Sequence, residues 1–190
     1  MKVVFLGPPG AGKGTQAKLL AERKGIAHVS TGEMLRAAVA AGTALGKQVK
    51  DIIDNGKLVP DELMVAIIQD RVKESDCAKG YILDGFPRTV PQAEALARML
   101  NANGVSLDSV VFFELSEEDI RKRLDHRRGV EQRADDTVAT QLERLRVYKE
   151  QTAPLVDFYR AKAVLTAVDA SGSVDEVYDK LLAALGDAGR

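Results

Sequence analysis

The sequence has a single cysteine, Cys77, among its 190 residues. One cysteine can form neither a disulfide within the chain nor a cysteine cluster for zinc. No apolar run approaches the roughly 20 residues that a membrane-spanning helix needs. Neither sign of charge is in excess, because 27 Lys+Arg and 28 Asp+Glu leave a net charge of −1. A nucleic acid or an anionic membrane is therefore not expected as a partner. Since no secretory leader pattern is present either, we expect a cytoplasmic protein.

What the chain does contain is an alternation of short apolar runs with helical patterns. The runs occupy residues 3–6, 81–83, 110–113 and 164–168, with a weaker one at 27–29. Continuous apolar runs of this length are typical of strands buried on both faces, as in a parallel sheet. The alternation predicts a doubly wound α/β fold, with ligands at the C-terminal ends of the strands.

Two segments do not fit this alternation. Residues 30–59 hold two short helical patterns and no strong strand, and residues 121–136 are rich in arginine and poor in core residues. We interpret both as insertions at the edge of the sheet, where mobile and functional elements tend to lie.

A glycine-rich loop follows the first predicted strand. Residues 7–15 read GPPGAGKGT and lead directly into a helical stretch. In such a loop the backbone N–H groups and the helix N-terminus surround phosphate oxygens, and Lys13 adds a positive charge near the β- and γ-phosphates. Strand, loop and helix in this order predict a nucleotide phosphate site.

One position of this loop departs from the general pattern G-x-x-x-x-G-K-[ST]. Gly14 stands where a hydroxyl would hold Mg²⁺, and the hydroxyl comes one place later, at Thr15. We interpret this as little direct ligation by the protein, with the ion held by phosphates and waters, which Mg²⁺ accepts readily. Asp84, at the end of the run 81–83, is the carboxylate expected near those waters. The alternative is an ordinary acidic residue at a strand end.

The sequence has many arginines but no evident general base, and this indicates which kind of group accepts the phosphoryl group. The two histidines, His28 and His126, lie in no motif. A phosphate acceptor, with a second pKa near ~6, is already largely ionised at neutral pH and needs no base. It needs charge neutralisation, which bidentate arginines provide well. The residues therefore favour a phosphate as the nucleophile.

Local signals place several of the polar residues. Ser30 and Glu33 fit an S-x-x-E capping box, which predicts a helix start with Thr31 in its first turn. Arg123 and Arg127 have the i, i+4 spacing of one helix face. A charge run of this kind is more often a solvated face than a site. The acidic pair at 135–136 is expected to cap the next helix.

Four motifs in order carry a family resemblance. They are residues 7–15, residues 30–36 (STGEMLR), residues 55–60 (NGKLVP), and residues 84–89 (DGFPRT) followed by Gln92. Together they resemble the nucleoside monophosphate kinases, and most closely the adenylate kinases. The similarity runs through the whole chain as far as Gly172, and several ordered motifs are far more specific than the phosphate loop alone.

The resemblance implies a three-layer P-loop NTPase fold, with a five-stranded parallel sheet flanked by helices and two insertions. The core would comprise residues 1–29, 60–125 and 137–190. Residues 30–59 would bind the nucleoside monophosphate, and residues 126–136 would form a short lid. Related kinases with a longer lid carry a cysteine cluster for zinc, so no zinc is expected here. The resemblance also implies a monomer.

The implied activity is reversible, Mg²⁺-dependent phosphoryl transfer from ATP to AMP, giving two ADP. Such an enzyme serves adenine nucleotide homeostasis and AMP salvage. A UMP/CMP kinase on the same scaffold is the nearest alternative, and Thr31 and Gln92 favour AMP over it. A P-loop switch or binding module that only cycles a nucleotide is a further alternative, although the N-K-x-D base reader of GTPases is absent from the sequence.

The resemblance also implies a role for each matching residue. The residues implied to hold ATP are Gly10, Ala11, Gly12, Lys13, Gly14, Thr15, Arg127 and Gly172. The residues implied to hold AMP are Thr31, Arg36, Lys57, Leu58, Val59, Gly85, Phe86, Pro87, Arg88, Gln92, Arg133 and Arg144. The residues implied to act in catalysis are Lys13, Arg88, Arg123, Arg133 and Arg144. Asp84 would hold Mg²⁺ through water.

Overall fold

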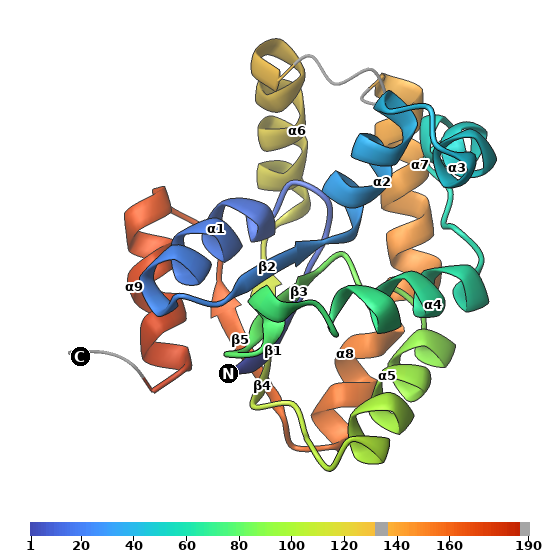
Figure 1. The fold of residues 1–190 in the computed structure, drawn as a ribbon. Helices are drawn as coiled ribbons and strands as arrows, with labels where there is room; N and C mark the ends of the chain where they lie inside the picture. The colour runs from blue at the N-terminus through green and yellow to red at the C-terminus, as the bar shows by residue number, and fades with distance from the viewer. Residues whose placement is uncertain (132–136, 187–190) are drawn as a thin grey trace.

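The computed structural model describes residues 1–131 and 137–186, with side chains described throughout except at 127–131. Its centre is a five-stranded sheet in the order β2-β3-β1-β4-β5 (Figure 1). The strands are β1 (Lys2–Leu6), β2 (Ala27–Ser30), β3 (Tyr81–Asp84), β4 (Ser109–Glu114) and β5 (Leu165–Asp169). Every neighbouring pair is parallel. The predicted α/β class, the five-stranded parallel sheet and all five strand positions are therefore confirmed.

Helices connect the strands and cover the sheet. The α-helices are α1 (Lys13–Lys24), α2 (Thr31–Ala40), α3 (Ala44–Asp54), α4 (Asp61–Arg71), α5 (Val90–Ala102), α6 (Glu117–Glu131), α7 (Val138–Val147), α8 (Pro154–Ala161) and α9 (Val174–Ala184). A 3₁₀ turn, η1 (Ser75–Cys77), precedes β3, and a π-helical turn, η2 (Tyr148–Thr152), joins α7 to α8.

The sheet is buried on both faces, which explains why its strands are apolar at nearly every position. In β1, Val3 and Phe5 belong to one core cluster, whereas Val4 and Leu6 belong to the other. Helices α1 and α9 cover the first face, and α4, α5 and α8 cover the second (Figure 1). Each fully buried side chain of this size contributes about 1.5–3 kcal/mol to folding, so the two clusters stabilise the layers strongly.

The segment 30–59 consists of α2 and α3, as the two short helical patterns predict. The two helices pack closely, because a Cβ atom on Gly46 of α3 would lie only 2.0 Å from the carbonyl oxygen of Ala38 in α2. The part of the arginine-rich stretch that the structure describes, residues 121–131, is also helical, since α6 continues to Glu131. Arg123 and Arg127 therefore lie on one helix, at the predicted spacing.

Two predicted helix caps differ from what the structure has. The Ser30 hydroxyl accepts a hydrogen bond from the Glu33 N–H (3.4 Å) and starts α2 as predicted. The Glu33 carboxylate instead contacts Lys18 of α1 at 2.7 Å, so the reciprocal half of the capping box was wrong. Helix α7 begins after Thr137, whose hydroxyl accepts from the Thr140 N–H (3.1 Å). The acidic pair at 135–136, predicted to cap this helix, lies outside the described residues, and the N-cap is Thr137 instead.

The junction between α7 and α8 is tied to the loop after β3. Pro154 opens α8, and proline has no N–H to donate to the preceding helical turn. The π-helical turn η2 lies directly before it. From η2, the Thr152 hydroxyl donates to the Arg88 carbonyl oxygen at 2.8 Å. This bond fixes the backbone that carries the Arg88 side chain.

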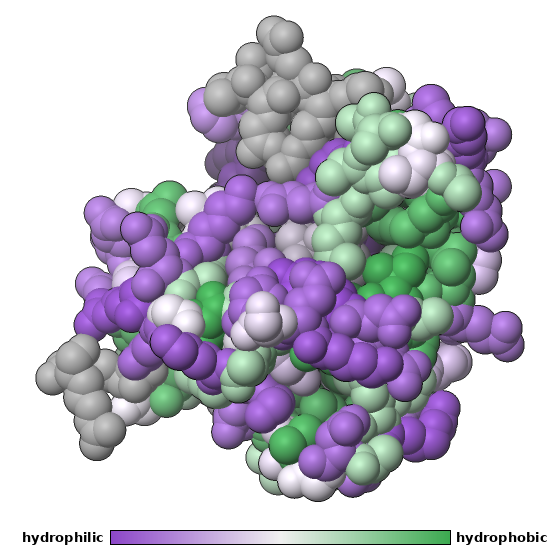
Figure 2. Space-filling view, viewed as in Figure 1, coloured by the Kyte–Doolittle hydropathy of each residue, from purple (hydrophilic) through white to green (hydrophobic). Residues whose placement is uncertain are grey.

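The surface of the described part is mainly polar on the face that Figure 2 shows. An apolar area lies at the right of that view, over α3 and α4. In residues 1–131 and 137–186, none of the helices is both long enough and apolar enough to cross a membrane.

Candidate active site

A cleft of about 880 Å³ opens at the C-terminal edge of the sheet. Its walls come from the loops after β1, β3 and β5, the start of α2, and parts of α6 and α7. This is where a doubly wound sheet places its ligands. The predicted site residues that line it are Gly10, Ala11, Gly12, Lys13, Gly14, Thr15, Thr31, Arg36, Lys57, Leu58, Val59, Asp84, Gly85, Pro87, Arg88, Gln92, Arg123, Arg144 and Gly172.

The phosphate loop connects β1 to α1 with the predicted geometry. Gly12 caps α1 with a φ of 84°, a left-handed conformation that glycine adopts without steric cost. The first turn of α1 has no acidic residue, so its N–H groups and dipole remain available to an anion. Lys13 folds back over the loop, and its Nζ donates to the carbonyl oxygens of Gly7 (2.8 Å) and Pro8 (2.9 Å). The N–H groups at the start of α1 and the Lys13 ammonium therefore give the loop a positive electrostatic potential on the side of the cleft.

Asp84 lies at the end of β3, beside this loop. A Cβ atom on Gly14 would be 3.4 Å from the Asp84 carboxylate, so the acid lies close to the start of α1. Burial disfavours ionisation of Asp84, whose side chain is only 12% exposed. The hydrogen bond with His28 and the charges of Lys13, His28 and Arg88 outweigh that effect and keep the pKa of this carboxyl below its ordinary value. Asp84 is therefore ionised at neutral pH.

The turn after β3 packs tightly against the start of α2. The Thr31 hydroxyl donates to the Gly85 carbonyl oxygen at 3.0 Å. Gly85 has a φ of 81°, and a Cβ atom there would lie 2.6 Å from the Thr31 oxygen, so only glycine fits. The next residue, Phe86, is 1% exposed and belongs to the hydrophobic core. Phe86 is not among the residues that line the cleft, and its implied role in holding AMP stays a prediction.

Three arginines from different elements approach one another on the acceptor side. Arg36 comes from α2, Arg88 from the turn after β3, and Arg144 from α7. Burial, and then the charges of Arg144 and Arg36, lower the pKa of Arg88, against the opposing effect of Asp84. Its Nε donates to the Gly85 carbonyl oxygen at 2.9 Å, which aims the guanidinium. Cations held this close together form a site for a multiply charged anion such as a phosphate.

Gln92 lies in the first turn of α5 and is 2% exposed, with part of its side chain on the cleft wall. Its Oε1 accepts from the Arg88 N–H at 2.8 Å, and its Nε2 donates to Asp61 Oδ1 at 2.7 Å. The Gln92 amide is therefore held by the protein before any ligand arrives.

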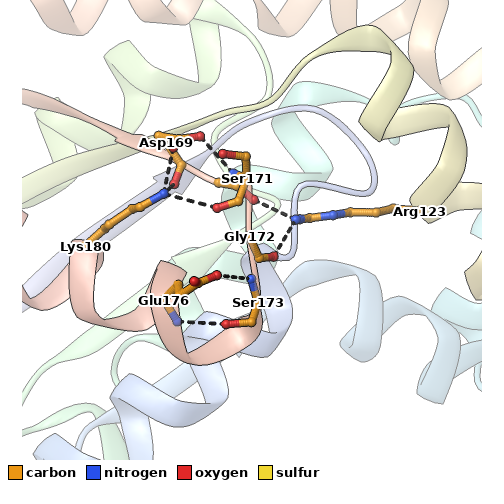
Figure 3. Close-up of polar contacts among 8 residues, drawn as sticks. Arg123, Asp169, Ser171, Gly172, Ser173, Glu176 and Lys180 are labelled. Carbon is orange, nitrogen blue, oxygen red and sulfur yellow. Dashed lines mark hydrogen bonds and ion pairs between the residues drawn. The ribbon is translucent and has the colours of Figure 1, made fainter.

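The opposite end of the cleft is formed by the loop after β5. Arg123 donates to the carbonyl oxygens of Ala170 (2.7 Å) and Gly172 (3.3 Å) and so joins α6 to this loop (Figure 3). Lys180 approaches from the other side, with its Nζ 2.6 Å from the Asp169 carboxylate and 3.1 Å from the Ser171 carbonyl oxygen (Figure 3). The loop is thus held between two cations. A complete capping box between Ser173 and Glu176 then starts α9.

Two of the predicted residues cannot be assigned to a wall of the cleft. The Arg127 backbone is in α6, but its side chain lies outside the described part of the structure. Arg133 lies outside the described residues altogether. Their roles remain predictions.

Three further residues support the site without any local sequence signal. His28 contacts Asp84 at 3.2 Å, Asp61 holds the Gln92 amide, and Lys180 holds the loop after β5. Each acts across a sequence separation of at least nine residues. Such contacts depend on strand order and helix placement, so no motif could have indicated them.

Comparison with known proteins gives one consistent result. The family model for adenylate kinase matches residues 5–164. An adenylate kinase of Kosmotoga olearia (strain ATCC BAA-1733 / DSM 21960 / TBF 19.5.1) is 48% identical, over 95% of this chain and 97% of its own length. An adenylate kinase of Parvibaculum lavamentivorans (strain DS-1 / DSM 13023 / NCIMB 13966) is 50% identical, over 98% of this chain and 92% of its own length. Another, from Mycobacterium sp. (strain MCS), is 50% identical over 98% of this chain and 99% of its own length.

Proposed function

Given that the chain belongs to the adenylate kinase family, and so is a nucleoside monophosphate kinase, we propose how its cleft divides between the two nucleotides. ATP binds with its phosphates on the loop between β1 and α1, and AMP binds with its phosphate among the three arginines. The observation that carries this division is the presence of two cationic regions in one cleft, with Asp84 under the influence of both Lys13 and Arg88.

The donor side of this proposal rests on backbone geometry. The N–H groups at the start of α1 and the Lys13 ammonium are arranged for the β- and γ-phosphates. The adenine of ATP then reaches the loop after β5, where Gly172 lines the cleft. Arg123, which now donates to that loop, lies where it can contact the phosphates as well, since its guanidinium is 3.7 Å from the Cβ position of Gly12.

The acceptor side rests on charge and on the polar residues around it. Arg36, Arg88 and Arg144 neutralise the AMP phosphate, which removes the repulsion between two polyanions. Thr31 and Gln92 lie on the same side of the cleft and supply the contacts to the nucleoside. Every nucleoside monophosphate carries the same phosphate, so the choice of base depends on such contacts.

The residues around Asp84 fit the Mg²⁺ that accompanies ATP. An ionised carboxylate stands beside the phosphate loop, 3.4 Å from the position of a Cβ atom on Gly14. Asp84 would hold waters of the ion rather than the ion itself. When bound, Mg²⁺ would supply charge neutralisation at the β- and γ-phosphates. The absence of zinc remains a prediction.

The transfer itself then requires positioning and electrostatics. An oxygen of the AMP phosphate attacks the γ-phosphorus in line, the bond to the β-phosphate oxygen breaks, and two ADP result. No base is needed, because the attacking oxygen is already ionised at neutral pH. Lys13, Arg88, Arg123 and Arg144 hold the transferring group and stabilise its charge. Water must be excluded, since it would otherwise take the phosphoryl group.

Neither alternative has support in the cleft. A UMP/CMP kinase would share the phosphate contacts and differ only at the base, and the three relatives named above are adenylate kinases. A nucleotide switch would leave the three-arginine region without a purpose. The division into a core, a segment 30–59 and a lid at 126–136 stays a prediction. We further propose a cytoplasmic monomer that serves adenine nucleotide homeostasis and AMP salvage, as its family and balanced charge suggest.

Gln92→Ala tests the acceptor side. The variant should lower kcat/KM for AMP by roughly tenfold to a hundredfold, because an unpaired polar group costs about 1–3 kcal/mol. The KM for ATP should change little, since Gln92 lies away from the phosphate loop. Steady-state kinetics with each nucleotide varied in turn provides the measurement.

The matched control is Glu94→Ala, which truncates an exposed side chain on the same helix. It should leave both KM values as in the wild type. A Gln92→Ala enzyme that kept its AMP preference over UMP and CMP, and lost affinity only for ATP, would show that the acceptor assignment of Gln92 is wrong.

A further inference from the structure

The two hydrogen bonds of the Gln92 amide depend on which end of the amide is the nitrogen. Its Oε1 accepts from the Arg88 N–H, and its Nε2 donates to Asp61 Oδ1. In the reversed orientation, the NH₂ group would face an N–H donor and the carbonyl oxygen would face a carboxylate, so both bonds would be lost. The surroundings of Gln92 therefore allow one orientation only.

Asp61 is itself anchored at the point where it holds this amide. It is the first residue of α4, and the Thr89 hydroxyl donates to the same Oδ1 at 3.0 Å. Thr89 is the N-cap of α5 and accepts from the Gln92 N–H at 3.3 Å. One carboxylate oxygen thus joins the start of α4 to the start of α5. The described residues that line the cleft include Gln92 but not Asp61, so Asp61 acts from behind the wall.

We propose that Asp61 is a positioning residue that sets the base preference of the acceptor site by fixing the orientation of the Gln92 amide. The proposal rests on the proposed function, in which Gln92 contacts the base of AMP. One Nε2 proton and one lone pair of Oε1 remain beyond the bonds to Asp61 and Arg88. These are the groups that the amide can offer to a base.

The orientation of the Gln92 amide matters because adenine and guanine have donors and acceptors in opposite positions on the edge that the amide would contact. Adenine has an amine donor beside an unprotonated ring nitrogen, whereas guanine has a carbonyl acceptor beside a ring N–H. An amide held in one orientation matches one of these edges and leaves unpaired groups against the other. An amide that can adopt either orientation matches the edges of both bases. Asp61 therefore favours AMP over GMP, because as a carboxylate it can only accept a hydrogen bond and so reinforces the orientation that the Arg88 N–H also selects.

Asp61→Asn is the test variant, since asparagine has the same size but can donate as well as accept. It removes the carboxylate that rejects the reversed amide and leaves the Arg88 N–H to oppose that orientation by itself. We expect the KM for AMP to rise about tenfold and the AMP-over-GMP ratio of kcat/KM to fall by a similar factor, the loss of about one hydrogen bond to a charged group. The kcat with AMP and the KM for ATP should stay near the wild-type values. The matched control, Glu62→Gln, neutralises the exposed neighbouring acid in the first turn of α4 and should change none of these quantities.

A double-mutant cycle separates positioning from general stability. In a Gln92→Ala background, Asp61→Asn should have no further effect on the KM for AMP, because it acts through the missing amide. The same rise in both backgrounds would overturn the proposal, and so would an unchanged AMP-over-GMP ratio in the single variant. If Gln92→Ala alone leaves the KM for AMP unchanged, the acceptor assignment fails first, and the positioning role of Asp61 fails with it.

Discussion

Arg88→Ala is expected to lower kcat by about 10³-fold or more, the scale on which an arginine contributes to a phosphoryl group in transfer. The melting temperature should stay unchanged or rise. Burial and the charges of Arg144 and Arg36 act against the Arg88 cation in the free enzyme, and its removal relieves that repulsion. This relief offsets the loss of the 2.9 Å bond from Nε to the Gly85 carbonyl oxygen. Arg88→Ala should therefore lower kcat without lowering the melting temperature.

Kinetics and thermal melts of the wild type and of three variants, Arg88→Ala, Arg88→Lys and Arg98→Ala, check this expectation. Arg98→Ala is the matched control, because Arg98 is exposed on α5 and away from the cleft. Arg88→Lys keeps the charge but loses bidentate geometry, so its kcat should lie between those of the wild type and Arg88→Ala. AMP should raise the melting temperature of the wild type more than that of Arg88→Ala, since a ligand stabilises only the protein that binds it. If Arg88→Ala had the wild-type rate and the wild-type response to AMP, Arg88 would not hold the AMP phosphate.

Lys13→Met is expected to lower kcat by about 10²- to 10³-fold, the cost of removing one preorganised group from a transition-state charge. The fold should persist. Lys13 is half-buried, and its two bonds to the carbonyl oxygens of Gly7 and Pro8 are lost in the variant. At about 1 kcal/mol for each bond, and ~2–4 °C for each kcal/mol in a chain of this size, the melting temperature should fall by several degrees.

Lys73→Met provides the control for Lys13→Met. Lys73 is an exposed lysine with a single ion pair, to Asp70 at 3.3 Å. Its replacement should leave kcat and the melting temperature near the wild-type values. Near-normal turnover by a folded Lys13→Met protein would contradict the assignment of the loop between β1 and α1 to the donor phosphates.

The central strands were predictable from the sequence because they are buried on both faces. Successive residues of β1 and β4 point into the two core clusters in turn, so the four apolar residues in each strand form a continuous run. The short run 27–29 was the weakest candidate because β2 is an edge strand whose alternate positions are only partly buried. The strand order itself has no local signal, since it arises from which helices pass over which face.

The parts of the site whose residues are adjacent in the sequence were predictable. The phosphate loop is one continuous segment, and its glycines and Lys13 are adjacent in the sequence. The contact between His28 and Asp84 exists because β2 and β3 are neighbours in the sheet. The contact between Asp61 and Gln92 exists because two helices start side by side. Neither pair has a spacing that a sequence pattern would reveal.

Helix caps were the least predictable feature, because several residues compete for the same N–H groups. The Glu33 side chain contacts Lys18 of another helix, although its spacing from Ser30 suits a capping box. The same spacing in Ser173 and Glu176 does give the complete box, since Glu176 donates its N–H to Ser173 and accepts from the Ser173 N–H. A long-range ion pair decides between these outcomes, and the sequence does not show it.

The most direct measurement is a coupled assay of the purified protein with Mg²⁺, ATP and one acceptor at a time, chosen from AMP, UMP, CMP and GMP. We expect kcat/KM to be highest for AMP, by roughly tenfold or more over each other acceptor, which corresponds to about one base hydrogen bond. We also expect two ADP for each ATP consumed with AMP, and almost no ADP when the acceptor is omitted. Equal or faster turnover with UMP or CMP, or ADP production that does not depend on an acceptor, would contradict the assignment of this cleft to phosphoryl transfer from ATP to AMP.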